Sequence, residues 1–429
     1  MLRNISEWKW LLESGSLDGR LDSIYPGGAA GARERYLCAL ERFLRTYGEA
    51  QVCICSAPGR TEIGGNHTDH QHGRVLAAAV DLDVLVIAAP AEDNTATVLS
   101  EGFEQFSVKI LRTGPDLAEQ GTSQALVRGV AESLIDMGYC AGGFNAYITG
   151  NVLQGSGLSS SAAFEVAVGA AISCMYNDSR IAQTELAIAA QRSENLYFGK
   201  PCGLMDQMAS AVGSLVQIDF MDPAAPKVQP VAIDLKAFPY DICIVDTGGS
   251  HADLTPDYAA VPAEMNAVAG FLGKDVLREV DAGFFNEQIP RLRQALGDRA
   301  VLRAIHFFRE NECVSREAAA LEEGDYPRFL ELVRQSGASS WKYLQNVTAG
   351  HDPAEQNLCI ALALSEQFLG DGGAARVHGG GFAGTIQAFV PRGRTEDYKK
   401  MIEAVFGRGS CYHLQVRPFG GIEVFPGEF

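Results

Sequence analysis

Residues 155–163 read Gly155-Ser156-Gly157-Leu158-Ser159-Ser160-Ser161-Ala162-Ala163, a stretch of small and polar side chains. The alternating run 144–152 predicts a strand before it, and the run 164–172 predicts a helix after it. A glycine loop that leads into a helix exposes backbone N–H groups where the helix dipole adds positive charge. We therefore predict an anion site, with phosphate as the usual ligand. A serine-capped corner is the alternative interpretation.

Two known phosphate-binding motifs do not fit this loop. No Gly-Lys-Ser or Gly-Lys-Thr follows it, so it is not a Walker A loop. Ser160 occupies the third glycine position of the dinucleotide fingerprint, so that motif fails as well. The glycines would still let the backbone approach an anion closely, and the serine hydroxyls could contact phosphate oxygens or a metal ion.

The composition indicates a globular, acidic protein. With 429 residues, of which 47% are hydrophobic, we expect two domains with substantial cores. The formal net charge of -18 disfavours nucleic acid or an anionic membrane as a partner. The chain shows neither a secretory signal nor a membrane-spanning window, so we expect a cytoplasmic protein. The ten cysteines lack zinc-site spacing and are expected to be reduced core thiols, with Cys53 and Cys55 on one face of a strand.

The hydrophobic periodicity predicts an α+β chain. Residues 1–50 are expected to be helical, most clearly at 34–47, after a glycine loop at 27–31. Strands are predicted at 52–56, 75–79, 84–89, 95–99, 106–111, 144–152, 214–220, 240–246 and 410–417, and helices at 123–137, 184–197, 354–369 and 395–406. Residues 257–334 are predicted to be mostly helical, and 374–390 to form strand, glycine loop and strand. A boundary within 208–235 gives an N-terminal domain of 1–215, which includes the helical extension 1–50, and a C-terminal domain of 216–429.

The loop predicted at 57–73 concentrates titratable side chains: Arg60, Glu62, His67, Asp69, His70 and His72. A metal site is one interpretation, but the irregular spacing fits poorly with ligands held on regular elements. A site for a sugar or ribose fits better, because hydroxyl-rich ligands need carboxylate acceptors and imidazole or amide groups close together.

Two more carboxylates and a second glycine loop complete the candidates. Asp206 lies among Leu204, Met205 and Met208, so we expect it to be partly buried, with Arg60 as a candidate partner. Glu194 precedes it by twelve residues, and a surface position is the ordinary interpretation of either carboxylate. Residues 379–384 match G-x-G-x-x-G but continue into a strand, which excludes a dinucleotide site and leaves a loop able to approach phosphates.

These loops, in this order, resemble the motifs of the GHMP small-molecule kinases, and of the galactokinases most of all. Residues 59–70 are similar to the family's Gly-Arg-x-Asn-x-Ile-Gly-Glu-His-x-Asp-Tyr, and 155–163 are a near-complete match to its second motif. Residues 201–207, Pro-Cys-Gly-Leu-Met-Asp-Gln, resemble the galactokinase segment that carries the catalytic aspartate. Residues 379–384 resemble the third motif, and Tyr258 with Glu264 resembles the sugar-contacting segment. The resemblance spans about residues 50–420.

The resemblance implies a fold and a set of roles. The fold would join an N-terminal domain like the second domain of ribosomal protein S5 to a C-terminal ferredoxin-like domain, with the active site between them. The reaction would be ATP- and Mg²⁺-dependent phosphorylation of a monosaccharide at its anomeric hydroxyl. Asp206 would be the base, Arg60 would stabilise it and the developing phosphoryl charge, and Ser160 and Glu194 would hold Mg²⁺. The ATP-binding set would be Gly155, Ser156, Gly157, Leu158, Ser159, Ser160, Ser161, Gly380 and Gly381, and the sugar-binding set Glu62, Asn66, His67, Asp69, Gly203 and Tyr258.

The first motif departs from the family pattern. Asn66 replaces the glutamate that contacts the outer hydroxymethyl of the sugar, Glu62 replaces an asparagine, His70 a tyrosine and Ala77 a proline. An amide both donates and accepts, whereas a carboxylate only accepts and carries charge. We hypothesise that the pocket has lost a charge that repels C6 carboxylates, so that uronic acids or other C6-modified galactoses become substrates.

Two rival functions remain at this stage. Some galactokinase relatives are catalytically silent sugar and ATP sensors that act on a regulatory partner, typically with damage in the Ser-Ala-Ala part of the second motif. Ser161-Ala162-Ala163 is intact here, which favours catalysis. The other rival is a GHMP kinase for a polyol or an amino sugar, against which the segment 202–206 favours the sugar branch. We expect a monomer or a weak homodimer.

Overall fold

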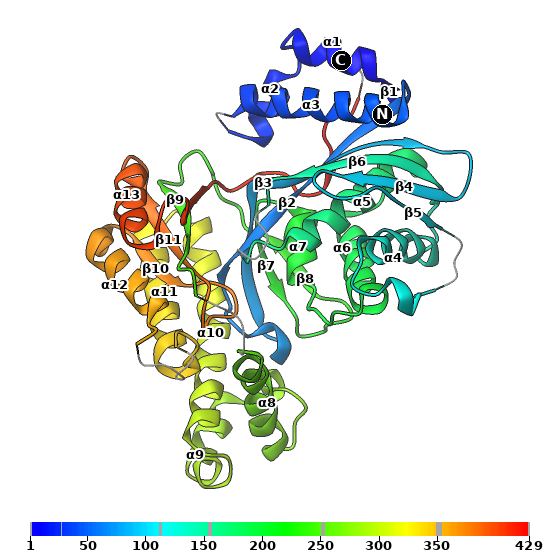
Figure 1. The fold of residues 1–429 in the computed structure, drawn as a ribbon. Helices are drawn as coiled ribbons and strands as arrows, with labels where there is room; N and C mark the ends of the chain where they lie inside the picture. The colour runs from blue at the N-terminus through cyan, green and yellow to red at the C-terminus, as the bar shows by residue number, and fades with distance from the viewer. Residues whose placement is uncertain are drawn as a thin grey trace.

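A large mixed sheet forms the centre of the molecule and receives strands from both ends of the chain (Figure 1). The computed structural model describes residues 2–26, 28–110, 114–152, 157–249, 254–348 and 354–427. Among these residues the large sheet has nine strands, in the order β1-β2-β3-β6-β4-β5, with β13 paired to β2, β7 to β3 and β8 to β7. The strands are β1 (Arg3–Asn4), β2 (Gln51–Gly64), β3 (Arg74–Pro90), β4 (Thr95–Ser100), β5 (Phe106–Lys109), β6 (Phe144–Gly150), β7 (Leu215–Asp219), β8 (Lys227–Pro230) and β13 (Ile422–Glu423).

The hairpin of β2 and β3 is longer than the sequence predicts. The prediction of a loop from residue 57 is wrong as far as Gly64, because β2 continues and pairs with β3 through register shifts at Pro58/Arg60 and Glu62/Gly64. The two strands predicted at 75–79 and 84–89 are one strand, β3. The misleading signals were charged side chains such as Arg60 and Asp83, which are buried within the strands and neutralised by distant partners.

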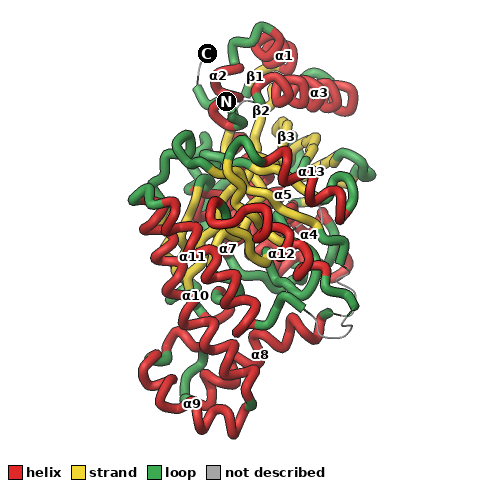
Figure 2. The backbone as a smooth tube through the Cα atoms, turned by 90° about the vertical axis from the view of Figure 1, so that its left-hand side faces the viewer, coloured by secondary structure: helices red, strands yellow, loops and turns green. Residues whose placement is uncertain are grey.

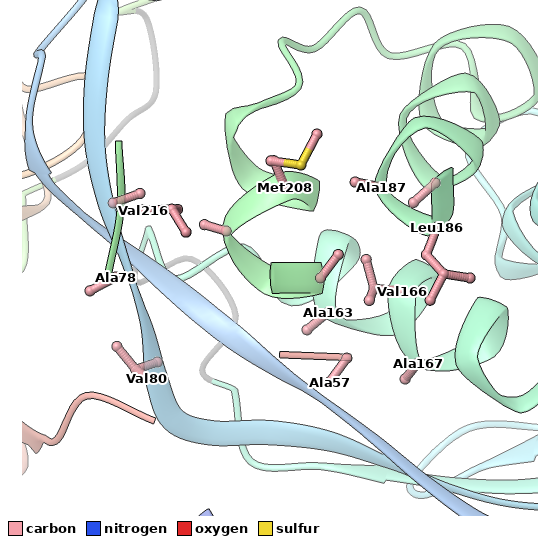
Figure 3. Close-up of a cluster of buried hydrophobic side chains, with 14 of the residues drawn as sticks. Ala57, Ala78, Val80, Ala163, Val166, Ala167, Leu186, Ala187, Met208 and Val216 are labelled. Carbon is pink, nitrogen blue, oxygen red and sulfur yellow. The ribbon is translucent and has the colours of Figure 1, made fainter. Parts of the chain in front are cut away.

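Four helices cover one face of the large sheet: α4 (Ser123–Asp136), α5 (Ser160–Tyr176), α6 (Gln183–Arg192) and α7 (Met205–Val212). Figure 3 shows the resulting core, in which Ala163 and Val166 of α5 lie beside Ala57 of β2, with Met208 of α7 close by. Small side chains on both surfaces let α5 approach the sheet closely. The predicted strand–loop–helix arrangement around residues 144–176 is confirmed, although α5 begins earlier than expected, at Ser160.

The N-terminal extension covers part of the opposite face of the sheet. Its helices α1 (Ile5–Glu13), α2 (Asp18–Ile24) and α3 (Ala29–Tyr47) lie above β2 and β3 in Figure 1. They pack on outward-facing residues of the sheet such as Ile54, Ile87 and Tyr147. The helical prediction for residues 1–50 is confirmed, but the expected loop at 27–31 is wrong from Ala29 onward, where α3 begins; Gly27 lies outside the described residues.

A buried ion cluster joins this extension to β3 and to the C-terminal part of the chain. Asp83 is fully buried and pairs with Arg35 of α3 and, at 2.7 Å, with Nη1 of Arg417 near the C-terminus. It also accepts hydrogen bonds from Tyr25 and Ser56. Although burial alone would raise it, these cations lower the pKa of Asp83 to about 2. The extension is therefore joined to the sheet by charge as well as by apolar packing.

The second half of the chain builds a smaller sheet and a helical arm. The sheet has the antiparallel order β10-β11-β9-β12, with β9 (Tyr240–Asp246), β10 (Ala374–Val377), β11 (Thr385–Pro391) and β12 (Cys411–Leu414), and α12 (Asn357–Leu369) and α13 (Thr395–Phe406) pack on it. Four helices precede β10: α8 (Thr255–Phe271), α9 (Ala282–Leu296), α10 (Asp298–Glu322) and α11 (Tyr326–Ser339). The helices α8 and α9 form the projecting arm in Figure 2, whereas α10 and α11 also pack against β3 and β10, respectively. The predicted α+β class and the helical stretch 257–334 are confirmed.

The predicted domain boundary at 215/216 stays a prediction. Strand β7 straddles it and β8 lies beyond it, yet both pair within the large sheet, and the smaller sheet begins with β9 at Tyr240. The strand predicted at 410–417 is shorter, because β12 ends at Leu414, and the chain then returns to the large sheet through β13. Among the described residues, no helix combines the length and the apolar character needed to cross a membrane.

Candidate active site

The predicted phosphate loop lies against β2, directly beside Arg60. The buried Leu158 carbonyl accepts a hydrogen bond from the Arg60 backbone N–H at 3.0 Å. A Cβ atom on Gly59 would lie only 2.9 Å from this carbonyl oxygen, so glycine is required for the close approach. The first motif and the phosphate loop are therefore joined through the backbone.

The loop enters α5 through a backbone geometry typical of functional sites. Gly155 and Ser156, two predicted ATP contacts, lie outside the described residues. Gly157 has φ of 75°, and Ser159 has φ of 56°, a left-handed conformation that is costly for a residue with a side chain. Because α5 begins at Ser160, its first backbone N–H groups lack helical partners and are available to an anion.

Arg60 and Asp206 form the pair that the sequence predicts. Arg60 Nε donates to Asp206 Oδ1 at 2.7 Å, and the Ser159 hydroxyl donates to the other carboxylate oxygen, Oδ2. Arg60 also donates from Nη1 to the Gly157 carbonyl. One guanidinium thus links the carboxylate to the loop, and both oxygens of Asp206 are oriented.

The electrostatics of this pair favour an ionised carboxylate. Burial acts to raise the pKa of Asp206, but the charge and hydrogen bond of Arg60, together with the Ser159 hydroxyl, lower the pKa below its usual value. Asp206 is the second residue of α7, so the helix dipole acts in the same direction. The Asp206 side chain is 29% exposed, which leaves it accessible to a ligand.

Glu194 lies in a setting that suits a cation. Its carboxylate is nearly buried, in the π-helical turn that follows α6, and it accepts from Gln207 Nε2 at 2.7 Å and Ser161 Oγ at 3.2 Å. Lys200 Nζ lies 2.9 Å from Oε1, so this carboxylate is paired with a cation in the structure. Because the lysine side chain is 61% exposed, it can withdraw when another cation binds. The residues present therefore fit Mg²⁺, which prefers oxygen ligands. Ser161, next to the predicted Ser160, makes the observed contact.

A second buried acid stands behind Glu194. Glu165 of α5 is fully buried, and Gln207 Nε2 donates to it at 3.3 Å as well as to Glu194. Burial first, and then the charge of Glu194, raise the pKa of Glu165 well above its usual value. Both effects favour the neutral form of Glu165 over a second buried carboxylate at this site.

Three predicted sugar residues meet the third motif. The consecutive carbonyls of residues 379–381 accept hydrogen bonds from Asn66 Nδ2 at 2.6 Å, His67 Nε2 at 3.0 Å and Tyr258 Oη at 2.8 Å, respectively. Asn346 Nδ2 donates to the Gly380 carbonyl at 3.1 Å. The first motif, the tyrosine of α8 and the third glycine loop thus form one hydrogen-bonded unit.

The two exchanged residues of the first motif contact each other. Asn66 Nδ2 donates to Glu62 Oε1 at 3.1 Å, and Arg376 Nη2 donates to the same oxygen at 3.0 Å. Burial raises the pKa of Glu62 to about 7, although Arg376 and Asn66 oppose this shift. The amide oxygen of Asn66 accepts from Asn346 Nδ2 at 2.8 Å. The first motif therefore keeps a carboxylate, but at position 62 on β2 instead of position 66. This carboxylate pairs with the buried guanidinium of Arg376.

Asp69 and Gly203 come together although 134 positions separate them (203 − 69). A Cβ atom on Gly203 would lie 3.0 Å from Asp69 Oδ2, so the glycine leaves room beside the carboxylate.

His70 packs edge-on against His67, with ring centroids 5.7 Å apart, and burial lowers the pKa of His70 to about 4. This histidine is therefore neutral near pH 7.

His378 is a support that sequence reasoning missed. It is buried, and its ring nitrogens each lie 3.0 Å from a threonine hydroxyl, Nε2 from Thr61 and Nδ1 from Thr385. A Cβ atom on Gly157 would lie 3.2 Å from its Cε1, so the ring underlies the phosphate loop. Burial, reinforced by the charge of Arg60, lowers the pKa of His378 to about 3. The ring is therefore neutral in the folded protein.

Other missed residues had weak signals in the sequence. Gln207 directly follows Asp206 in a quoted motif without a role having been assigned to it. Arg376 interrupts an apolar run before the third motif, and such a charge needs a buried partner. Nothing local distinguishes Asn346 or Glu165, since their partners lie far away in the chain.

Comparisons with known proteins agree with this geometry. Residues 125–214 match the GHMP kinases N terminal domain, and residues 41–90 match the galactokinase galactose-binding signature. The galactokinase of Mannheimia succiniciproducens is 32% identical over 352 residues, which cover 81% of this chain and 87% of that protein. The crystal structure of Lactococcus lactis galactokinase complexed with galactose superposes with a TM-score of 0.75 at 26% identity, over 90% of this chain and all of the other. Methanococcus jannaschii mevalonate kinase shares the fold, with a TM-score of 0.58 at 13% identity over 85% of this chain and 98% of the other.

The chain belongs to the GHMP kinase family, as the matched N-terminal domain and the extended similarity to a galactokinase require. Within that family it is a galactokinase-like sugar kinase, because the galactose-binding signature and the 32% identical relative both point to this branch. The fold predicted from the motifs is thereby confirmed. The roles assigned to individual residues stay predictions.

Proposed function

We propose that this protein transfers the γ-phosphoryl group of ATP to the anomeric hydroxyl of a monosaccharide. The observation that carries the proposal is the Arg60–Asp206–Ser159 arrangement beside the loop that opens α5. It places an ionised carboxylate next to a predicted phosphate site. Phosphoryl transfer depends on positioning and charge stabilisation, and this arrangement offers both.

Asp206 is the proposed base. Its carboxylate accepts the proton of the sugar hydroxyl while the hydroxyl oxygen attacks the phosphorus atom and ADP leaves. Arg60 keeps the carboxylate ionised and orients it, since Nε holds Oδ1 at 2.7 Å. The same guanidinium, which also contacts the Gly157 carbonyl, lies where it can stabilise charge on the transferring group.

Ser160 and Glu194 would hold Mg²⁺, with Ser161 and Gln207 orienting the Glu194 carboxylate. When bound, Mg²⁺ supplies positive charge to the phosphate oxygens. In a chain with a formal net charge of -18, such local positive charge is needed for a polyanionic substrate. The raised pKa of Glu165 favours its neutral form, which would avoid a further negative charge next to Glu194.

For the sugar, we propose a galactose modified at C6, with a uronic acid as the leading candidate. The carboxylate of the first motif is at Glu62, matched by Arg376, so the amide of Asn66 replaces a charge at the position that the family uses for the outer hydroxymethyl. An uncharged amide repels a C6 carboxylate less than a glutamate would. His67, Asp69, Gly203 and Tyr258 are proposed to contact the remaining hydroxyls.

A sugar panel tests the proposal. ADP release should be measured with galactose, galacturonic acid, other C6-modified galactoses and a glucose control, and the phosphorylated position should be assigned by NMR. We expect a C6-modified galactose to have the highest kcat/KM, with phosphate at the anomeric carbon. A clear preference for unmodified galactose would refute the C6 assignment but leave the kinase assignment intact. Binding of sugar and MgATP without ADP release from any sugar would instead favour the catalytically silent sensor.

A further inference from the structure

Three cysteine thiols converge between the large sheet and α5, away from the kinase site. Cys53 and Cys55 lie on the same face of β2, and Cys174 lies in the last turn of α5. All three side chains are buried, and their sulfur atoms lie within 4.8 Å of one another. All ten cysteines of the chain are in the thiol form, but Cys38 and Cys140 are exposed, so the expectation that all are core residues is wrong for these two.

The spacing of the three sulfurs suits a single three-coordinate ion. With bonds of ~2.3 Å to sulfur, a flat trigonal centre holds its sulfur atoms about 4 Å apart, and a pyramidal centre such as trivalent arsenic, whose lone pair closes the angles, holds them roughly 3.5 Å apart. From a spacing of at most 4.8 Å, the thiols therefore need to close by at most roughly 1.3 Å to hold arsenic, which side-chain rotations can supply. We propose that Cys53, Cys55 and Cys174 form a binding site for a soft, thiophilic ion, with trivalent arsenic as the ligand that fits best.

Charge is the reason for choosing arsenic. When arsenous acid binds, three S–H bonds and three As–OH bonds break, three As–S bonds form, and three water molecules leave. No electron is transferred, and the product carries no net charge. A divalent ion on three thiolates would leave one negative charge within the apolar core cluster to which all three cysteines belong.

The position of the site gives binding a measurable consequence. An ion held by all three sulfurs connects β2, which carries Arg60, to α5, which begins at the phosphate loop. A ligand that binds only the folded state stabilises that state in proportion to its occupancy. Because Cys55 precedes Arg60 by five residues, or about 16 Å along an extended strand, we do not expect the ion to contact the substrates.

Arsenite titration followed by native mass spectrometry and thermal unfolding tests the site. The matched variants are Cys174→Ala, which removes one of the three sulfurs, and Cys411→Ala, which breaks the buried Cys243–Cys411 pair that offers only two. We expect wild type and Cys411→Ala each to gain the mass of one arsenic atom less three hydrogen atoms, which leave in the three water molecules, and to show a rise in Tm. Cys174→Ala should lose both effects, and Cys174→Ser provides the same test if the alanine variant is unstable. Failure of the folded wild type to bind, equal binding by Cys174→Ala, or preferential binding of Cd²⁺ over arsenite would overturn the proposal.

Discussion

Replacement of Asp206 by asparagine separates proton transfer from binding. The amide has the shape of the carboxylate, so its oxygen can still accept from Arg60 Nε, and its nitrogen can donate to Ser159 Oγ if that hydroxyl rotates. The fold should therefore persist. What is lost is the negative charge and the ability to accept a proton.

The size of the effect follows from the role. A positioned general base contributes about 10² to 10⁴ in rate, which corresponds to roughly 3 to 5 kcal/mol in the activation free energy. We therefore expect kcat of Asp206→Asn to fall by at least about 10²-fold. Since Asp206 Oδ1 and Oδ2 contact protein groups rather than the predicted metal residues, the Kd for MgATP should change by less than about threefold, or under ~0.7 kcal/mol.

Ser159→Ala is the matched control. It removes the hydroxyl that donates to Oδ2 but leaves the Arg60 contact and the charge of Asp206. Loss of this hydrogen bond should raise the pKa of Asp206, and the base is active only when ionised. The acid limb of the kcat/KM profile should therefore move to higher pH, while activity at pH 8 stays within about tenfold of wild type, or ~1.4 kcal/mol.

The assay is coupled ADP release with saturating sugar, combined with calorimetric measurement of MgATP binding and a thermal melt for each variant. Turnover by Asp206→Asn within about tenfold of wild type, a barrier change of only ~1.4 kcal/mol, would remove Asp206 from the base role. A parallel loss of MgATP binding and of Tm would show that the substitution disturbed the site rather than the chemistry.

Three further outcomes are expected. Asp83→Ala should lower the free energy of unfolding by roughly 3 to 5 kcal/mol in urea titrations, because it leaves Arg417 buried without its carboxylate. Since the pKa of Asp83 is lowered to about 2, the free energy of unfolding of the wild type should fall as pH drops from ~4 towards 2. The variant should lack this pH-dependent loss. The pKa of Glu62 is raised to about 7, so ionisation of Glu62 destabilises the folded state as pH rises from ~4.3 through 7. The Tm of Glu62→Gln should therefore rise relative to that of the wild type across this pH range. A Tm difference that does not change with pH would contradict the shift. The double variant Glu62→Asn with Asn66→Glu should move the kcat/KM ratio towards unmodified galactose, with Glu62→Asn alone as its control.

The phosphate side of the site was predictable because its signals are local. The loop 157–161, its strand and its helix are continuous in sequence, and glycine, serine and a helix start carry their meaning without long-range information. The Arg60–Asp206 contact was also within reach, since a carboxylate flanked by Leu204 and Met205 requires a cation, and Arg60 is the one lysine or arginine of the first motif. The length of β2 was missed because the same charge indicated a loop.

The sugar side resisted prediction because most of its contacts join distant parts of the chain, from 123 positions between Tyr258 and Gly381 to 314 between Glu62 and Arg376. Asn66 looks like a free ligand contact in the sequence, yet its amide bonds to Glu62 and to the Gly379 carbonyl, 313 positions away. The departure from the family pattern is therefore an exchange within a contacting pair, in which Arg376 matches the displaced carboxylate. A charge moved onto a buried strand and neutralised there alters the field at the sugar without adding an unpaired ion to the core. Substrate preference in this chain thus depends on the Glu62–Asn66–Arg376 unit as a whole, and a single substitution at Asn66 would leave half of the exchange in place.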